Sequence, residues 1–200
     1  MHLHDRFAEF LSVSEIIEAT PALLNDQRRR FVSSPDIVLQ PNSVESVQKI
    51  MRFCFENRIR VTPQGGNTGL CGATVTTEGV LLNLSKLNRI RDINLADNSM
   101  TVEAGVILQN AQKAATEAGR LFPLSLASEG SCQIGGNIAC NAGGLNVLRY
   151  GSMRDLVLGL EVVLPNGELV SHLQPLHKNT TGYDLRHLFI GSEGTLGIIT

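Results

Sequence analysis

Residues 63–70 read Pro-Gln-Gly-Gly-Asn-Thr-Gly-Leu and begin the first of three glycine-rich segments, at 63–79, 130–151 and 191–197. The second contains Gly-Ser-Cys-Gln-Ile-Gly-Gly-Asn at 130–137 and Asn-Ala-Gly-Gly at 141–144. The third is Gly-Ser-Glu-Gly-Thr-Leu-Gly. These segments hold fourteen of the nineteen glycines. Because glycine loses much conformational freedom on folding, such clustering indicates left-handed backbone or backbone lying against a ligand.

The first two segments carry almost no charge. Glu78 is the only charged residue between positions 61 and 79, and there is none between 130 and 148. An anion held here would be bound by backbone amides and neutral side chains, at about 1.5–3 kcal/mol for each hydrogen bond to a charged group. Tight turns in a sheet protein are the alternative, but three clusters rich in Ser, Thr and Asn favour a ligand site.

The composition narrows the classes of function. The 200 residues carry a net charge of −2 and no tryptophan, which argues against non-specific nucleic-acid binding. No apolar run reaches the ~18 residues of a membrane helix. The four cysteines lack C-x-x-C spacing and indicate reduced thiols in the cytoplasm. Peripheral contact with a membrane is a variant of this location. The histidines lack a metal-ligand spacing, so no metal site is predicted.

Hydrophobic periodicity predicts alternating helices and strands after a helical lead-in at residues 1–34. Within the lead-in, Arg28-Arg29-Arg30 is predicted to be a solvated helix face, or else a contact to an acidic ligand group or a partner domain. Ser43 is expected to cap a helix that buries Val47, Ile50, Met51, Cys54 and Phe55. Strands are expected at 37–39, 60–63, 80–84, 99–103 and 196–199.

The second half of the chain carries further local signals. Residues 107–118 form a helical stripe that ends at Gly119. Residues 160–164 and 169–170 flank Asn166-Gly167, which predicts a hairpin with a two-residue turn. A short helix is expected at 184–189, with Tyr183 packing on it and Asp184 capping it.

Neither common nucleotide motif is present. The Rossmann pattern G-x-G-x-x-G and the P-loop pattern G-x-x-x-x-G-K-[ST] occur nowhere in the chain. The glycine segments therefore need another geometry, in which loops from separate places close on one long ligand.

The quoted motifs at 63–70 and 130–144, with Gly-Tyr-Asp-Leu and Gly-Ser-Glu-Gly-Thr-Leu-Gly-Ile-Ile-Thr between 182 and 200, resemble the PCMH-type FAD-binding domain of the vanillyl-alcohol oxidase superfamily. The resemblance is strongest to FAD-linked D-2-hydroxyacid dehydrogenases, which include D-2-hydroxyglutarate dehydrogenase, cytochrome-type D-lactate dehydrogenase and the glycolate oxidase FAD subunit. It runs from about residue 37 to residue 200.

The resemblance implies an α+β fold in which two α+β subdomains hold FAD between them. The FAD-binding domain would occupy 35–200, with a subdomain boundary near 90–100. A substrate-binding domain is expected after residue 200, outside this chain.

The resemblance also implies the cofactor-binding residues. The first loop would wrap the pyrophosphate, the second segment would follow the pyrophosphate and isoalloxazine, and the third would lie near the adenine and ribose. The expected set is Pro63, Gln64, Gly65, Gly66, Asn67, Thr68, Gly69, Leu70, Gly130, Ser131, Cys132, Ile134, Gly135, Gly136, Asn137, Ala139, Asn141, Ala142, Gly143, Gly144, Tyr150, Gly151, Glu193, Gly194 and Ile198.

Two departures from the family pattern bear on the flavin. Some relatives attach it through a His after the Gly-Gly of the first loop, where this chain has Asn67, so non-covalent FAD is expected. Cys132 is a conceivable attachment site, although packing or a backbone contact is the preferred interpretation. Cys140 stands where relatives of this branch often carry Thr, a small change that we expect to be tolerated.

The function implied is oxidation of a D-2-hydroxyacid, of the D-2-hydroxyglutarate or D-lactate class, by an FAD-dependent dehydrogenase. Reduced FAD would pass electrons to a quinone, cytochrome or electron-transfer flavoprotein, often in a homodimer. The catalytic base, carboxylate-binding Arg and any metal ligands would follow residue 200, so no catalytic residue is named and residues 1–200 alone are expected to be inactive. The alternatives are a stand-alone FAD-binding module and another oxidoreductase of the superfamily, such as an enolpyruvyl reductase or a sugar-lactone oxidase.

Overall fold

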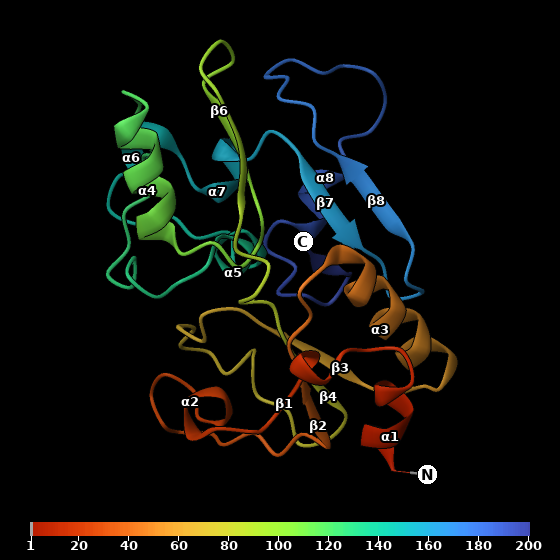
Figure 1. Ribbon diagram of the computed structural model, residues 1–200. Helices are drawn as coiled ribbons and strands as arrows, with labels where there is room; N and C mark the ends of the chain where they lie inside the picture. The colour runs from red at the N-terminus through yellow and green to blue at the C-terminus, as the bar shows by residue number, and fades with distance from the viewer. Residues whose placement is uncertain (1) are drawn as a thin grey trace.

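The computed structural model describes residues 2–200 and shows two halves, one above the other in Figure 1. The lower half contains a four-stranded sheet of order β1-β2-β4-β3, in which β2, β4 and β3 are parallel and β1 is antiparallel to β2. Its elements are α1 (Leu3–Ala8), a 3-10 turn (Val13–Glu15), β1 (Ile16–Ile17), α2 (Pro21–Leu24), β2 (Ile37–Leu39), α3 (Val44–Glu56), β3 (Val61–Gln64) and β4 (Val80–Asn83).

The upper half contains two smaller antiparallel sheets. One is the hairpin β5-β6, and the other has the order β8-β7-β9. Its elements are β5 (Ile90–Asn94), β6 (Ser99–Val102), α4 (Leu108–Glu117), α5 (Ile134–Ala139), α6 (Val147–Tyr150), α7 (Met153–Leu156), β7 (Leu160–Val163), β8 (Leu169–His172), α8 (Arg186–Phe189) and β9 (Ile198–Ile199). No helix within residues 2–200 is long and apolar enough to cross a bilayer.

Helix α3 shows how the sequence builds the lower core. The Ser43 side chain accepts a hydrogen bond from the backbone N–H of Ser46 at 3.1 Å, which confirms the predicted N-cap. Four of the five predicted apolar positions are buried, but Phe55 is 60% exposed. Phe53 is packed instead, because the rings of Phe7 and Phe10 from the α1 region cover it at centroid distances of 4.9 and 5.4 Å.

Strands β7 and β9 of the upper half contribute side chains to the cores of both halves. Val163 and Ile198 pack into the lower core, whereas their neighbours Val162 and Ile199 pack into the upper core. This follows from strand geometry, because successive side chains point to opposite faces. One pair of strands therefore joins both cores.

The β7–β8 turn fastens this sheet to α3. Its loop is Pro165–Gly167, with Leu164 N–H bonded to Glu168 O, so the predicted two-residue turn is in fact a three-residue turn. Gly167 has φ +83°, the left-handed residue that such loops require. Its carbonyl accepts a hydrogen bond from Gln48 Nε2 at 3.1 Å, and a Cβ here would lie 2.7 Å from Gln48 O.

Other local predictions are confirmed or need correction. Strands were predicted correctly, within a residue or two, at β2, β3, β4, β6 and β9, as was helix α4 with Gly119 in the left-handed region after it. The lead-in is only partly helical, because Ile16–Ile17 form β1 on the edge of the sheet, and Arg28–Arg30 lie in an exposed turn and not on a helix. Strand β5 was missed, since its sequence Ile-Arg-Asp-Ile-Asn is mostly polar.

A buried carboxylate stabilises the start of the upper half. The Glu103 side chain is 1% exposed, and its Oε1 accepts hydrogen bonds from Arg89 Nε at 3.0 Å and Nη2 at 2.7 Å. Its Oε2 accepts from the Arg89 backbone N–H at 2.8 Å. Burial opposes ionisation of this carboxyl, but the hydrogen bonds from Arg89 outweigh it, so the pKa of Glu103 lies below its ordinary value of 4.5.

We expect Glu103→Gln to lower the free energy of unfolding at neutral pH by about 1–3 kcal/mol, because charge-assisted hydrogen bonds to a buried group are lost. A lowered folded-state pKa means that this contribution is complete above pH 4.5 and is lost as the pH falls through the folded-state pKa. Denaturant unfolding of both proteins across this range should show the gap closing in acid.

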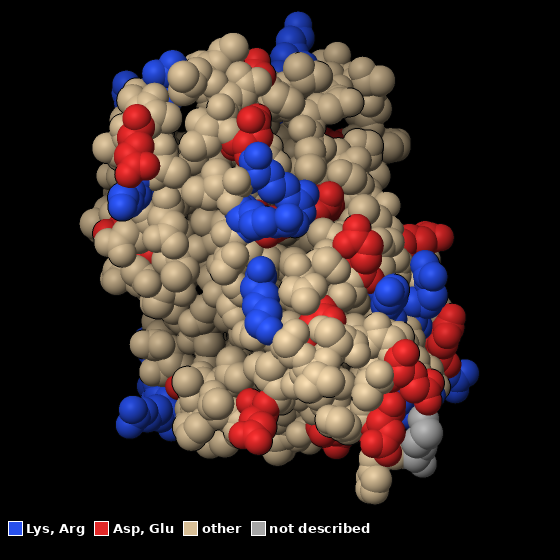
Figure 2. Space-filling view, viewed as in Figure 1, with Lys and Arg blue, Asp and Glu red and all other residues tan. Residues whose placement is uncertain are grey.

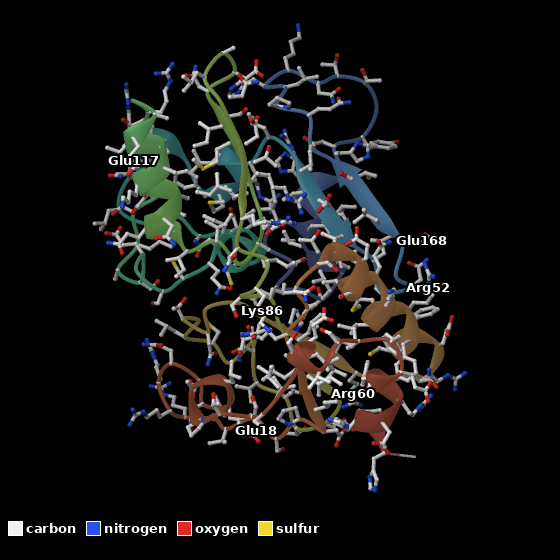
Figure 3. All side chains as sticks on the ribbon, in the orientation of Figure 1. Glu18, Arg52, Arg60, Lys86, Glu117 and Glu168 are labelled. Carbon is white, nitrogen blue, oxygen red and sulfur yellow. The ribbon has the colours of Figure 1, made fainter. Side chains whose placement is uncertain are left out.

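The control for this prediction is Glu117→Gln on the outer face of α4 (Figure 3). Glu117 is exposed, and its ion partner among residues 2–200 is Lys113, at 3.9 Å. Exposed pairs of this kind contribute little, so stability should hardly change. A gap for Glu103→Gln that stayed constant from neutral to acid pH would contradict the assignment.

Candidate functional site

The first and second glycine segments meet backbone against backbone. A Cβ atom on Gly66 would lie 2.1 Å from the carbonyl oxygen of Ser131 and 3.2 Å from the Cα of Cys132. A Cβ on Gly65 would lie 3.2 Å from Gln133 Oε1 and 3.9 Å from the backbone N of Gly136. The loop after β3 in the lower half is therefore in contact with the start of α5 in the upper half.

The third glycine segment joins the same place. Gly191 N–H donates to Ile138 O at 3.1 Å, and Glu193 N–H donates to Ala139 O at 2.9 Å. Glu193 and Gly194 both have positive φ, +51° and +78°, and a Cβ on Gly194 would lie 2.4 Å from Pro63 Cγ. All three segments thus converge on the end of β3 and on α5.

Buried amide side chains fix where the first loop starts. Gln64 is 1% exposed, and its Nε2 donates to Leu23 O at 2.9 Å. Asn83, at the end of the neighbouring strand β4, donates to Gln64 Oε1 at 3.2 Å and to Gly65 O at 3.4 Å. Asn83 was not among the predicted site residues, because only the parallel pairing of β3 with β4 places it beside the loop.

Asn67 shapes the loop and faces away from the second segment. Its backbone is left-handed, with φ +52°. Its Nδ2 donates to Ala22 O at 3.2 Å and Asn25 O at 2.7 Å, and its Oδ1 accepts from Thr74 Oγ1 at 2.8 Å. The side chain is thus fully occupied in binding the loop to the α2 region.

The first loop leaves a run of backbone donors free. Within residues 2–200, no N–H group of residues 65–70 donates to a protein acceptor, and the same is true of Gly136 N–H in α5. Residues 65–68 are partly exposed, and Gly69 and Leu70 are exposed. Several amides that lack internal partners and lie close together form a site suited to an anion.

The surroundings of the first loop carry few charged side chains, although Glu193 of the third segment lies beside α5. The area between α2 and α5, where the first loop lies in Figure 1, shows almost no charged atoms in Figure 2. Phe31 packs on the first glycine segment, because a Cβ on Gly72 would lie 3.3 Å from its ring. Arg28, Arg29 and Arg30 directly precede Phe31 in the sequence. Within residues 2–200 their guanidinium groups form no hydrogen bond with the first glycine loop, whose unpaired N–H groups carry partial positive charge.

Some predicted residues can offer only their backbone to a ligand. The side chains of Cys132 and Ile134 are buried in the upper core, and that of Ile198 is buried in the lower core. Asn137 is buried and donates from Nδ2 to Cys132 Sγ at 3.5 Å. Gly135 packs on Ala104, where a Cβ would be 2.6 Å from the Ala104 Cβ.

The later part of the second segment makes other contacts. A Cβ on Gly144 would meet Ser125 O at 2.1 Å, and one on Gly151 would meet Asp155 at 2.5 Å. Asn141 Oδ1 accepts from Arg154 N–H at 2.9 Å. Tyr150 is 42% exposed on α6. None of these contacts is with the first loop. The structure therefore places residues 131–136, and not 141–151, against that loop.

Two cysteines border the site. Cys71 and Cys140 are exposed, free thiols. Desolvation by the surrounding protein, with the neighbouring Glu193 and Cys71, raises the pKa of the Cys140 thiol. Cys140 is therefore a poor nucleophile in this position.

The segment after β8 contains no catalytic group in a buried site. Tyr183 is 96% exposed and does not pack on α8, contrary to the prediction. Asp184 does not cap this helix; it pairs with Arg186 Nε at 2.8 Å and with His187 Nε2 at 3.4 Å. These exposed groups support no acid–base chemistry here.

A separate apolar cavity lies on the other side of α5. It has a volume of about 330 Å³ and lies between the β5–β6 hairpin and β7. Ile134 and Ile138 of α5 line it, together with Phe122, Met153 and Leu160. No residue of the first or third glycine segment lines it, so it is distinct from the place where the segments converge.

The comparisons with known proteins identify the family of the chain. A family model described as "FAD binding domain" matches residues 35–172. The chain is 42% identical over 200 residues to D-2-hydroxyglutarate–pyruvate transhydrogenase of Saccharomyces cerevisiae, covering 97% of this chain and 40% of the relative. It is 48% identical over 175 residues to D-2-hydroxyglutarate dehydrogenase of Xanthomonas citri, covering 87% of this chain and 37% of the relative.

The same fold occurs in a solved structure of alkyldihydroxyacetonephosphate synthase. The TM-score is 0.84 at 19% identity, and the match covers 98% of this chain and 37% of that one. At this identity the likeness concerns the fold alone. The chain thus spans about two fifths of the length of each of these proteins.

We expect Gly66→Ala to separate the first loop from α5, because its Cβ would lie 2.1 Å from Ser131 O. The free energy of unfolding should fall by roughly 1–3 kcal/mol, as for other overpacked sites. Denaturant unfolding measures the loss, and limited proteolysis of the first loop measures its detachment.

Gly69→Ala is the matched control in the same loop. A Cβ at this position meets nothing within 4 Å, and Gly69 is not in the left-handed region. Stability should be unchanged or slightly increased. Equal losses for both substitutions would show that the contact between Gly66 and Ser131 does not hold the segments together.

Proposed function

The chain belongs to the family of FAD binding domains, and on this premise we propose that the converging glycine segments hold the diphosphate of FAD. The observation that carries the proposal is the run of backbone N–H groups at residues 65–70 that donate to no acceptor within residues 2–200, in a loop packed against the start of α5. A diphosphate presents only acceptor oxygens, so backbone donors match it without a lysine or arginine. Each such bond contributes about 1.5–3 kcal/mol.

The donor set fits FAD in a second respect. The close approach of Gly65 and Gly66 to residues 131–136 needs positions without Cβ atoms, and the lower and upper halves each supply one wall. A ligand bound at this junction can contact residues of both halves. Of the predicted cofactor-binding residues, we assign the main role to those of the first loop, to 130–137 and to Glu193–Gly194, and we keep the others as predictions.

We propose that the flavin is held without a covalent bond. The Asn67 side chain is fully hydrogen-bonded toward α2, and an amide is not a nucleophile. The Cys132 thiol is 1% exposed within the upper core, which supports the packing role expected for it. The thiol of Cys140 has a raised pKa.

We further propose that the intact protein oxidises a D-2-hydroxyacid, with D-2-hydroxyglutarate as the first candidate. The support is the names of the two relatives that are 42% and 48% identical. FAD, when bound, supplies the electron-accepting chemistry. The residues described here bind and orient the cofactor, and the base and carboxylate-binding groups would lie outside them, in a substrate-binding domain.

Several finer points belong to the same proposal. We expect an external electron acceptor of the quinone, cytochrome or electron-transfer flavoprotein class, and a homodimer. A reducing compartment such as the cytoplasm is supported by four free cysteines. We keep the subdomain boundary near 90–100, which is supported by the packing of Leu87 in the lower core and of Ile90 against the upper one.

The purified intact protein should carry a yellow chromophore, or its apo form should take up FAD. Acid precipitation should release the flavin into the supernatant, because no covalent bond holds it. Anaerobic D-2-hydroxyglutarate should bleach the flavin absorbance, and the L-enantiomer serves as the control. Absence of FAD uptake by folded protein would refute the site, whereas FAD binding without bleaching by any D-2-hydroxyacid would refute only the substrate.

A further inference from the structure

One polar atom at the site has no partner. Gln133 lies just before α5 and is 7% exposed, and its Oε1 is a buried side-chain oxygen that accepts no hydrogen bond from residues 2–200. Buried polar atoms are almost always paired, because an unpaired one forfeits its hydration without compensation. Gln133 was absent from the predicted site residues.

The unpaired oxygen lies where the two walls of the site meet. It is 3.2 Å from the position of a Cβ on Gly65, and the free N–H of Gly136 is 3.9 Å from that same position. It thus stands among the unpaired backbone donors of the first loop and α5.

Gln64 provides a direct contrast at the same junction. It is equally buried, but both ends of its carboxamide are paired, to Leu23 O and to Asn83 Nδ2. Gln64 therefore fixes the loop within the protein alone. Gln133 offers an acceptor that the protein leaves open.

We propose that Gln133 Oε1 accepts a hydrogen bond from a donor group of bound FAD. The inference rests on the proposed FAD site. The diphosphate has only acceptors and matches the backbone amides, so an open acceptor must meet another part of the ligand. FAD has hydroxyl and N–H donors on both sides of its diphosphate, in the ribityl-isoalloxazine half and in the adenosine half. Gln133 is thus a cofactor-binding residue, and its Oε1 binds a hydroxyl or N–H group of FAD that lies next to the diphosphate.

The test is Gln133→Met, which keeps the length of the side chain and removes the acceptor. The affinity for FAD, measured by calorimetric titration of the apo protein, should fall about fivefold to tenfold, as for loss of one hydrogen bond. The melting temperature of the apo protein should be unchanged or higher, because an unpaired buried oxygen has been removed.

Gln64→Met is the matched control for stability. It breaks hydrogen bonds that exist without ligand, so the apo melting temperature should fall. Opposite effects of the two substitutions on the apo protein are the expected signature. If Gln133→Met also destabilises the apo protein and leaves FAD affinity unchanged, the oxygen serves a buried water and the proposal is overturned.

Titration with FMN and with ADP locates the donor. A weaker affinity of Gln133→Met for FMN alone assigns the donor to the flavin half, and a weaker affinity for ADP alone assigns it to the adenosine half. Either result supports the proposal. Unchanged FAD affinity overturns it while leaving the FAD site standing, whereas absence of FAD binding by the unmodified protein overturns both.

Discussion

The structure depends on one close approach, that of Gly66 to the carbonyl of Ser131. Any side chain at this position would push the loop after β3 away from α5, because the place of its Cβ lies 2.1 Å from that oxygen. The contact brings together residues that are 65 positions apart in the sequence, one from each half.

The sheet determines where this contact forms. β2, β4 and β3 run parallel, so their carboxyl ends lie at one edge, and the first glycine loop leaves from that edge. Loops at the carboxyl ends of parallel strands are the usual place for ligands in open α/β sheets. In this chain the loop at that edge is glycine-rich but carries no Rossmann motif. Asn83 and Gln64, at the ends of adjacent strands, use their amides to hold the loop at this edge.

Much of the site could be predicted because its signals are local. Glycine clustering and the lack of charge are visible in residues 63–72 and 130–144, and the three segments do converge. The predictions that were wrong or missing concern residues whose environment is set by segments far away in the sequence. Phe55 fits the helical stripe as well as Cys54 does, and only the docking of Phe7 and Phe10 decides that Phe53 is covered. In the sequence, Gln133 is one polar residue in a neutral stretch and carries no signal of its own. Its role becomes visible only because the fold places Gly65 beside it.

The spacing of the two walls is set by β7 and β9. Val163 and Ile198 are anchored in the lower core, and Val162 and Ile199 in the upper core, so the halves cannot move apart without exposing apolar side chains of one pair. Burial of each such side chain contributes roughly 1.5–3 kcal/mol, which makes separation costly. Gly167, in the turn between β7 and β8, packs against α3 and accepts a hydrogen bond from Gln48, which fixes the two halves at a second point. A site of neutral amides needs this rigidity, because short hydrogen bonds lose their strength quickly with distance and angle, whereas the attraction between full charges would persist.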